Sequence, residues 1–96
     1  MHKPKPDKKE TWYKELITLM QKSAHTKQSL TEFLTDLLTP AEQLYLAQRW
    51  QVVKLLNEGM SQREIVDELG VGINTVTRGS HILANKQGAF YKILNK

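Results

Sequence analysis

The segment QREIVDELGVGINTVTR, residues 62–78, contains two short helical patterns separated by a glycine, and the architecture of the chain follows from it. Ser61, with Glu64 three residues later, is typical of a capping box at the start of a helix. Gly70 ends that helix after about two turns, because glycine takes positive φ at little steric cost and so permits a sharp bend. A second helix follows at once. The spacing predicts a helix-turn-helix over about residues 61–86.

The second helix of this pair is expected from about Ile73 to Lys86. The side chains expected to pack the two helices together are Ile65, Val66, Leu69, Val71, Ile73 and Val76. Polar side chains are expected to face outward at the leading end of the second helix. In helix-turn-helix proteins this end meets base edges in the major groove. Asparagine reads adenine, threonine contacts bases, and arginine suits guanine or phosphate. The outward residues are Asn74, Thr75, Thr77 and Arg78. A plain helical hairpin with a glycine turn is the structural alternative.

The rest of the chain is also expected to be helical, because apolar residues recur at intervals of three and four and no long segment alternates. Capping signals place further helix starts near Asp7, at Ser29 and at Thr39, where Pro40 suits the first helical turn. A short helix follows over 89–94. Together the apolar stripes exceed what one short monomer covers well, so an all-α homodimer is predicted.

Length, charge and the distribution of apolar residues indicate the number of domains, the kind of partner and the location of the protein. The 96 residues suggest one domain, over 7–96, after a disordered basic arm at 1–6 that is either a solvated tail or a contact for DNA phosphates. The net charge of +4 mildly favours an anionic partner. No apolar run is long enough for a membrane span, and the first residues lack the apolar core of a secretory signal, so a cytoplasmic protein is expected.

Metal and catalytic chemistry find little support. The chain has no cysteine, and its three histidines lack metal-ligand spacing, so no metal or cofactor is expected. The acidic residues Glu42, Glu64 and Asp67 stand at helix starts, where capping explains them, and no nucleophile–base pair is evident. The chain is therefore not expected to be an enzyme.

Gly79 is unusual, because glycine inside a helix costs about 1 kcal/mol relative to alanine. Thr75, Gly79 and Ile82 share one helical face, with Arg78 at its edge. A missing side chain there indicates either close packing against another helix or a notch for a ligand. The spacing alone leaves both interpretations open.

Several segments resemble the tryptophan operon repressor family over about residues 30–86. They are Leu38-Thr39-Pro40-Ala41-Glu42, Gln48-Arg49, Met60-Ser61-Gln62-Arg63-Glu64 and Thr75-Val76-Thr77-Arg78-Gly79-Ser80. The resemblance implies an intertwined, six-helix homodimer that represses transcription from a palindromic operator of tryptophan biosynthesis or transport, with L-tryptophan as corepressor.

The same resemblance implies roles for individual residues. The indole of tryptophan would lie between Arg49 and Arg78, against a wall formed by Thr75 and Gly79, with Thr39 contributed by the partner chain. Two guanidiniums flanking an aromatic ring are physically sensible, because arginine both stacks and makes cation–π contacts. For DNA, the resemblance implies backbone positioning by Gln62 and Arg63, and base contacts by Ile73, Asn74 and Thr77.

Two other functions remain open. Ile82 stands where the family has a serine that helps to hold the ligand's amino group, and isoleucine cannot accept that hydrogen bond. A repressor-like regulator that needs no ligand is therefore one alternative. A helical protein–protein adaptor that uses the same apolar stripes is the other.

Overall fold

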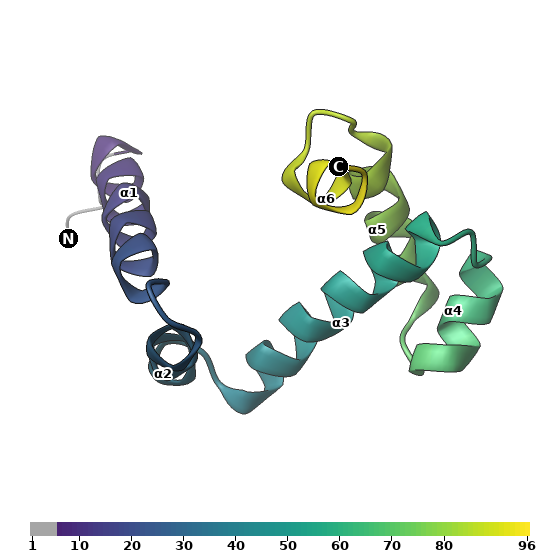
Figure 1. Ribbon diagram of the computed structural model, residues 1–96, viewed down its shortest axis with the longest axis horizontal. Coiled ribbons are helices and arrows are strands. Elements are labelled where there is room, and N and C mark those ends of the chain that lie inside the picture. The colour runs from purple at the N-terminus through teal and green to yellow at the C-terminus, as the bar shows by residue number, and fades with distance from the viewer. Residues whose placement is uncertain (1–5) are drawn as a thin grey trace. The chain divides into compact units, whose positions relative to one another are not determined.

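The computed structural model describes the backbone of residues 6–96 and the side chains from Lys8 onward, and this part of the chain is all helix and turn (Figure 1). The all-α prediction is thus confirmed. Its helices are α1 Pro6–Ser23, α2 Lys27–Leu37, α3 Pro40–Asn57, α4 Gln62–Leu69, α5 Ile73–Ala84 and α6 Ala89–Leu94. None of the described helices is long and apolar enough to cross a membrane.

The chain forms two compact units, Met1–Pro40 and Ala41–Lys96. The single domain expected over 7–96 stays a prediction. Of the arm expected at 1–6, residues 1–5 lie outside the described residues, and Pro6 is already the first residue of α1. Helix α1 therefore begins one residue before the expected start, in keeping with the preference of proline for the first helical turn.

In the first unit, α1 and α2 contact each other, and α2 begins earlier than its sequence suggests. The start expected at Ser29 is wrong, because Thr26 is the cap: its side-chain oxygen accepts a hydrogen bond from the backbone N–H of Ser29 at 3.0 Å. Threonine and serine are both good capping residues. The sequence offers both candidates three residues apart, and the earlier one adds nearly a turn to the helix.

The second unit has its core where α3, α4 and α5 meet. Val52, Ile65 and Val76 are fully buried there, one from each helix. Around them lie partly buried side chains, namely Leu55, Leu56, Met60, Val66, Leu69 and Val71. Figure 1 shows α4, α5 and α6 gathered around the C-terminal end of α3. This small core positions α5 against α3.

The connection between α4 and α5 forms as its sequence predicts. The Ser61 hydroxyl accepts from the Glu64 N–H at 3.2 Å, and the Glu64 carboxylate accepts from the Ser61 N–H at 3.3 Å, which completes the capping box. Gly70 ends α4 in the left-handed conformation, with φ of 65°. Val71 then packs against the core cluster from within the turn. The local signals are sufficient to produce this bend.

Helix α5 is shorter than expected and ends at Ala84 instead of Lys86. Asn85 terminates it, because its side-chain oxygen accepts from the Gln87 N–H at 3.1 Å and its backbone carbonyl accepts from the Gly88 N–H at 2.9 Å. Asparagine favours such local hydrogen bonds over continued helix. The resulting turn leads directly into α6.

Two contacts hold α6 to α3. The rings of Trp50 and Phe90 meet edge to face, with centroids 5.6 Å apart and planes at 81°. Such a pair adds about 0.5–1.5 kcal/mol beyond the area it buries. At the other end, the Asn95 side-chain amide donates to the Asn57 side-chain oxygen at 3.0 Å. The C-terminal helix is therefore an integral part of the second unit.

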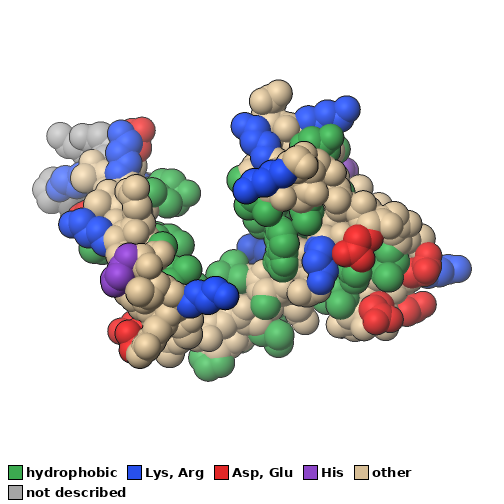
Figure 2. All heavy atoms as spheres, viewed as in Figure 1, with side chains coloured by type: hydrophobic (Ala, Val, Ile, Leu, Met, Phe, Trp, Pro, Cys, Tyr) green, Lys and Arg blue, Asp and Glu red, His purple; other side chains and the backbone are tan. Residues whose placement is uncertain are grey.

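Large apolar side chains nevertheless remain exposed in both units, and Figure 2 shows hydrophobic side chains at the surface over much of the chain. The exposed large hydrophobic residues are Trp12, Tyr13, Ile17, Leu19, Leu37, Leu44, Tyr45, Leu46, Ile73 and Ile93.

Candidate nucleic-acid interface and ligand pocket

The first turn of α4 carries two of the residues expected at DNA. The Ser61 cap places Gln62 and Arg63 at the start of the helix, where Arg63 is exposed and Gln62 is half-buried. The Thr77 hydroxyl donates a hydrogen bond to the Gln62 side-chain oxygen at 3.4 Å. This contact joins α4 to α5 and brings together side chains that are 15 residues apart in the sequence. The structure thus places Gln62 beside Thr77 on one surface.

The leading end of α5 presents a mixed polar and apolar surface. Asn74 and Arg78 are exposed, whereas Thr77 is half-buried beside Gln62. Ile73 is 52% exposed, so its expected packing against α4 is wrong. Val71 in the turn and Val76 in α5 fill the inner positions as expected, whereas Ile73 is not part of this cluster. That exposure is compatible with the expected contact of Ile73 with bases, which stays a prediction.

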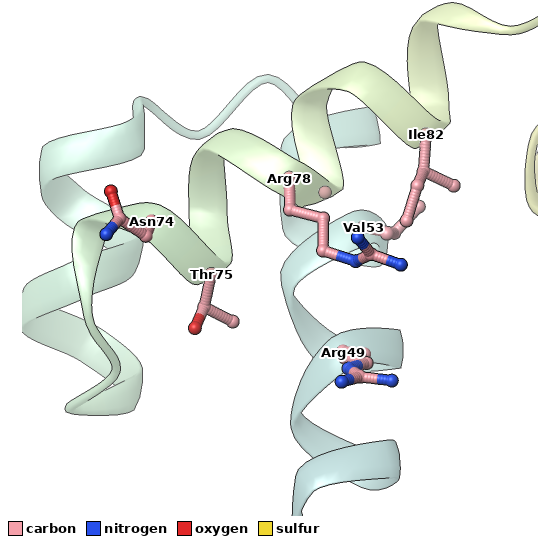
Figure 3. Close-up of a pocket in the computed structure, with 7 residues that line it drawn as sticks. Arg49, Val53, Asn74, Thr75, Arg78 and Ile82 are labelled. Atoms are coloured by element: carbon pink, nitrogen blue, oxygen red, sulfur yellow. The ribbon is translucent and has the colours of Figure 1, made fainter.

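A pocket of about 220 Å³ lies between α3 and α5 (Figure 3). Arg49, Thr75, Arg78 and Gly79 line it, so the structure brings together four of the five residues expected to hold a ligand. Thr39, the fifth, belongs to the first unit. The pocket is formed by side chains of two helices, and these side chains are about 30 positions apart in the sequence. Its role as a ligand site stays a prediction.

The pocket has three further lining residues. Ile82 closes one side, as its place on the face of Thr75 and Gly79 suggests, and Asn74 reaches the same hollow from the leading end of α5. Val53 was missed by the sequence analysis. The signal was present, because Val53 lies four residues after Arg49 and therefore on the same face of α3.

Gly79 has a packing role, and it also lines the pocket, so each of its two interpretations has an observation behind it. A β-carbon added there would lie 2.6 Å from a methyl carbon of Val52, closer than real β-carbon contacts come. Gly79 and Val52 are both buried. Close packing of α5 on α3 is therefore sufficient to explain the glycine, although Gly79 also lines the pocket. The pocket and its charges are therefore the features that point to a ligand.

Those charges are positive. The Arg49 and Arg78 side chains are both exposed, and the pocket lining contains no aspartate or glutamate. Within residues 8–96 neither arginine forms an ion pair with a carboxylate; an ion pair in that range joins Lys14 to Glu10 at 3.9 Å on α1. Figure 3 shows the Arg78 side chain extending from α5 toward α3, near Val53. The arrangement suits a small anionic or zwitterionic molecule with a flat apolar part.

Metal-binding clusters are not found among the described residues, in which no three histidine, aspartate or glutamate side chains come together. His25, one of the histidines, contacts the backbone carbonyl of Lys22 through its Nδ1 atom at 2.8 Å, near the end of α1. The candidate binding sites among the described residues are thus the pocket and the α4–α5 surface.

Comparison with known proteins gives a consistent result. The family model described as Trp repressor protein matches residues 11–96, which extends the similarity well beyond the segment 30–86. A Trp operon repressor homolog of Vibrio vulnificus (strain YJ016) is 42% identical over 77 residues, covering 79% of this chain and 74% of that protein. One of Chlamydia trachomatis serovar L2 (strain ATCC VR-902B / DSM 19102 / 434/Bu) is 33% identical over 95 residues, covering 94% and 96%. These names describe transcriptional regulators and not enzymes.

Proposed function

The chain belongs to the Trp repressor family, and we propose that it is a sequence-specific DNA-binding repressor, active as a homodimer, with L-tryptophan as corepressor. Its targets would be operators of tryptophan biosynthesis or transport. The observation that carries the proposal is the capped α4, the bend at Gly70 and the exposed polar start of α5, all on one surface. A capped helix, a bend and a second helix with an exposed polar start are the features with which helix-turn-helix proteins meet the major groove, and they support the proposal.

On DNA, α5 enters the major groove with its leading end. Asn74 and Arg78 are exposed there and carry donors that match adenine and guanine edges. Gln62 and Arg63, at the start of α4, are placed to contact the sugar–phosphate backbone. Through the hydrogen bond between Gln62 and Thr77, a backbone contact by α4 also orients α5. Phosphate contacts position the protein, and base contacts select the sequence.

A second copy of the chain supplies what one chain lacks. The hydrophobic side chains that are buried in the described part, Val52, Val53, Ile65 and Val76, all belong to the second unit. Helix α2 has no buried residue at all, although it carries an apolar stripe. A core this small makes a 96-residue chain marginal as a monomer. Pairing of two chains through α1, α2 and the first half of α3 covers the exposed apolar side chains of these helices. It also places two α5 helices on successive half-sites of a palindrome.

L-Tryptophan fits the charges of the pocket between α3 and α5. Arg49 and Arg78 offer two guanidiniums for the faces of the indole and for the carboxylate. The pocket of about 220 Å³ is smaller than the roughly 300–1,000 Å³ typical of ligand sites, so a further wall is needed. Thr39 from the second chain would supply it. The ligand bridges α3 and α5, and it favours the placement of α5 that fits DNA only by its difference in affinity between the two states.

A regulator that needs no ligand is the second candidate, and Ile82 favours it. Ile82 lines the pocket and offers an aliphatic side chain where a zwitterion needs an acceptor for its ammonium group. Burying an ammonium group without a partner is strongly unfavourable. In this case the pocket would be closed by the second chain, and α5 would be held in place by packing alone.

Selection of duplexes from a random-sequence pool tests the DNA-binding part. We expect a palindromic consensus, and an affinity that falls steeply with salt concentration because phosphate contacts release counterions. Binding that is absent, or that does not depend on salt, refutes DNA binding and favours an adaptor function.

Calorimetric titration with L-tryptophan separates the two regulators. Arg78→Ala should abolish tryptophan binding, because Arg78 lines the pocket, while Arg63→Ala should preserve it and weaken DNA binding alone. A wild-type protein that binds the selected duplex equally well with and without tryptophan supports the ligand-independent regulator. Tryptophan binding that survives in Arg78→Ala means that the ligand binds elsewhere.

A further inference from the structure

A second hollow, larger than the pocket, lies along the exposed face of α5 and ends at the turn before α6. Its volume is about 570 Å³, and it is open to solvent along α5. It is lined by Asn74, Thr77, Arg78, His81, Ile82, Asn85 and Gly88. We refer to it as the α5 groove. Its leading residues are those proposed to contact DNA, whereas His81 and Asn85 have no role in that proposal.

We propose that the α5 groove binds the sugar–phosphate backbone of duplex DNA, and that His81 is the residue on which this contact depends. The inference rests on the proposed DNA-binding function and adds a phosphate site to it. The groove offers hydrogen-bond donors along its length, from the Arg78 guanidinium, the His81 imidazole and asparagine amides. None of its lining residues is acidic, so nothing there repels a phosphate.

The position of His81 around the helix points toward DNA. An α-helix advances about 100° per residue, so Thr77, Asn74 and Arg78 span an arc of about 100°. His81 falls inside that arc, about 20° from Asn74. Its side chain is exposed, in the last turn of α5. A surface that meets DNA through Asn74, Thr77 and Arg78 therefore also presents His81.

The position of His81 along the helix favours a contact with phosphate over a contact with bases. His81 lies eight residues after Ile73, which corresponds to about 12 Å along the axis. The major groove of B-DNA is about 12 Å wide and 8.5 Å deep. The proposed function has α5 entering the groove with its leading end first. A residue about 12 Å from that end then lies beyond the depth of the groove, beside the backbone at the groove's edge. His81 is thus placed at a strand of phosphates.

The far end of the α5 groove is structurally fixed. Asn85 holds the turn through hydrogen bonds to the N–H groups of Gln87 and Gly88. A β-carbon at Gly88 would lie only 3.1 Å from the Asn85 carbonyl oxygen, so the chain is compact there. Because Asn85 has this structural role, its substitution would not test DNA contact. His81 is the suitable target, since no hydrogen bond ties its side chain to the rest of the described chain.

Fluorescence anisotropy with the selected duplex and with a random duplex tests the inference. His81→Ala should weaken binding to both duplexes about tenfold, as expected for loss of a hydrogen bond to a charged group. His81→Glu should weaken it further by repelling phosphate, and His81→Lys should restore it. Alanine is the better helix former, so His81→Ala does not act through loss of α5. His25→Ala, which removes a histidine from the first unit, is the matched control and should bind as the wild type does.

Each outcome is decisive. If the wild type binds DNA with a steep salt dependence and His81→Ala and His81→Glu bind equally well, the inference is wrong and the proposed function stands. A loss confined to the selected duplex would mean a base contact and would also overturn the phosphate site. If the wild type binds no duplex at all, the proposed function fails, and the inference fails with it.

Discussion

Gly79→Ala should destabilise the protein, although alanine is the better residue for a helix interior. The added β-carbon would lie 2.6 Å from Val52 Cγ1, with carbon atoms of Val53 and Leu56 at 3.6 Å. Val52 cannot move aside easily, because it is fully buried and its β-branched side chain has one strongly preferred rotamer in a helix. Relief of the overlap therefore requires α5 to shift away from α3.

The magnitude follows from two opposing effects. Overpacking of a close-packed core costs about 1–3 kcal/mol, and an overlap this deep belongs near the upper end. Helix propensity returns about 1 kcal/mol. The net loss in the free energy of unfolding is about 2 kcal/mol. For a domain of this size each kcal/mol lowers the Tm by about 4–8 °C, so a fall of about 8–16 °C is expected.

Urea denaturation at a fixed protein concentration measures this loss, because the stability of an oligomer depends on concentration. Ser80→Ala is the matched control, since it changes helix propensity at the next position and should alter stability by less than about 0.5 kcal/mol. In a double-mutant cycle with Val52→Ala, the combined loss should be smaller than the sum by about 3 kcal/mol, because the clash disappears. A Gly79→Ala protein as stable as the wild type would show that α5 does not approach α3 so closely.

Substitutions at three further positions test the local structure of the second unit. Gly70→Ala should lower the free energy of unfolding in urea by about 1–2 kcal/mol because of the positive φ, and Gly70→Asn should lower it less. Equal losses in the two variants would indicate a steric clash instead, although the space around Gly70 is open. Ser61→Ala should cost about 1 kcal/mol through loss of the α4 cap, while Ser61→Asp should be close to neutral; an unchanged urea midpoint for the alanine variant would contradict the capping box. Phe90→Leu should cost about 1 kcal/mol and change the fluorescence of Trp50, and an unaltered emission spectrum would mean that α6 does not pack on α3.

Much of the second unit is predictable because its signals are local. The capping box of Ser61 and Glu64 and the left-handed Gly70 each depend on atoms within a few residues, and so does the start of α3 at Pro40, the last residue of the first unit. Such signals act in the same way whatever the rest of the chain does. The ends of α2 and α5 were less predictable, because Thr26 competed with Ser29, and Asn85 with a continued helix, over differences of about 1 kcal/mol.

The candidate pocket was predictable only in part. Arg49, Thr75, Arg78 and Gly79 were expected together because of a family resemblance, since no periodicity links α3 to α5 across the intervening residues. The inward-facing Ile73 was a wrong expectation, because a helical pattern does not show where the neighbouring helix ends.

Gly79 shows the boundary between the two kinds of information. Its cost to the helix is visible in the sequence, but the atom that demands it, a methyl group of Val52, lies 27 positions earlier in the chain and on another helix. Caps and turns are settled by short-range hydrogen bonds and backbone sterics, which adjacent residues specify. The exposure of Ile73, the need for Gly79 and the gathering of two arginines arise from the packing of whole helices, which depends on side-chain volumes distant in sequence.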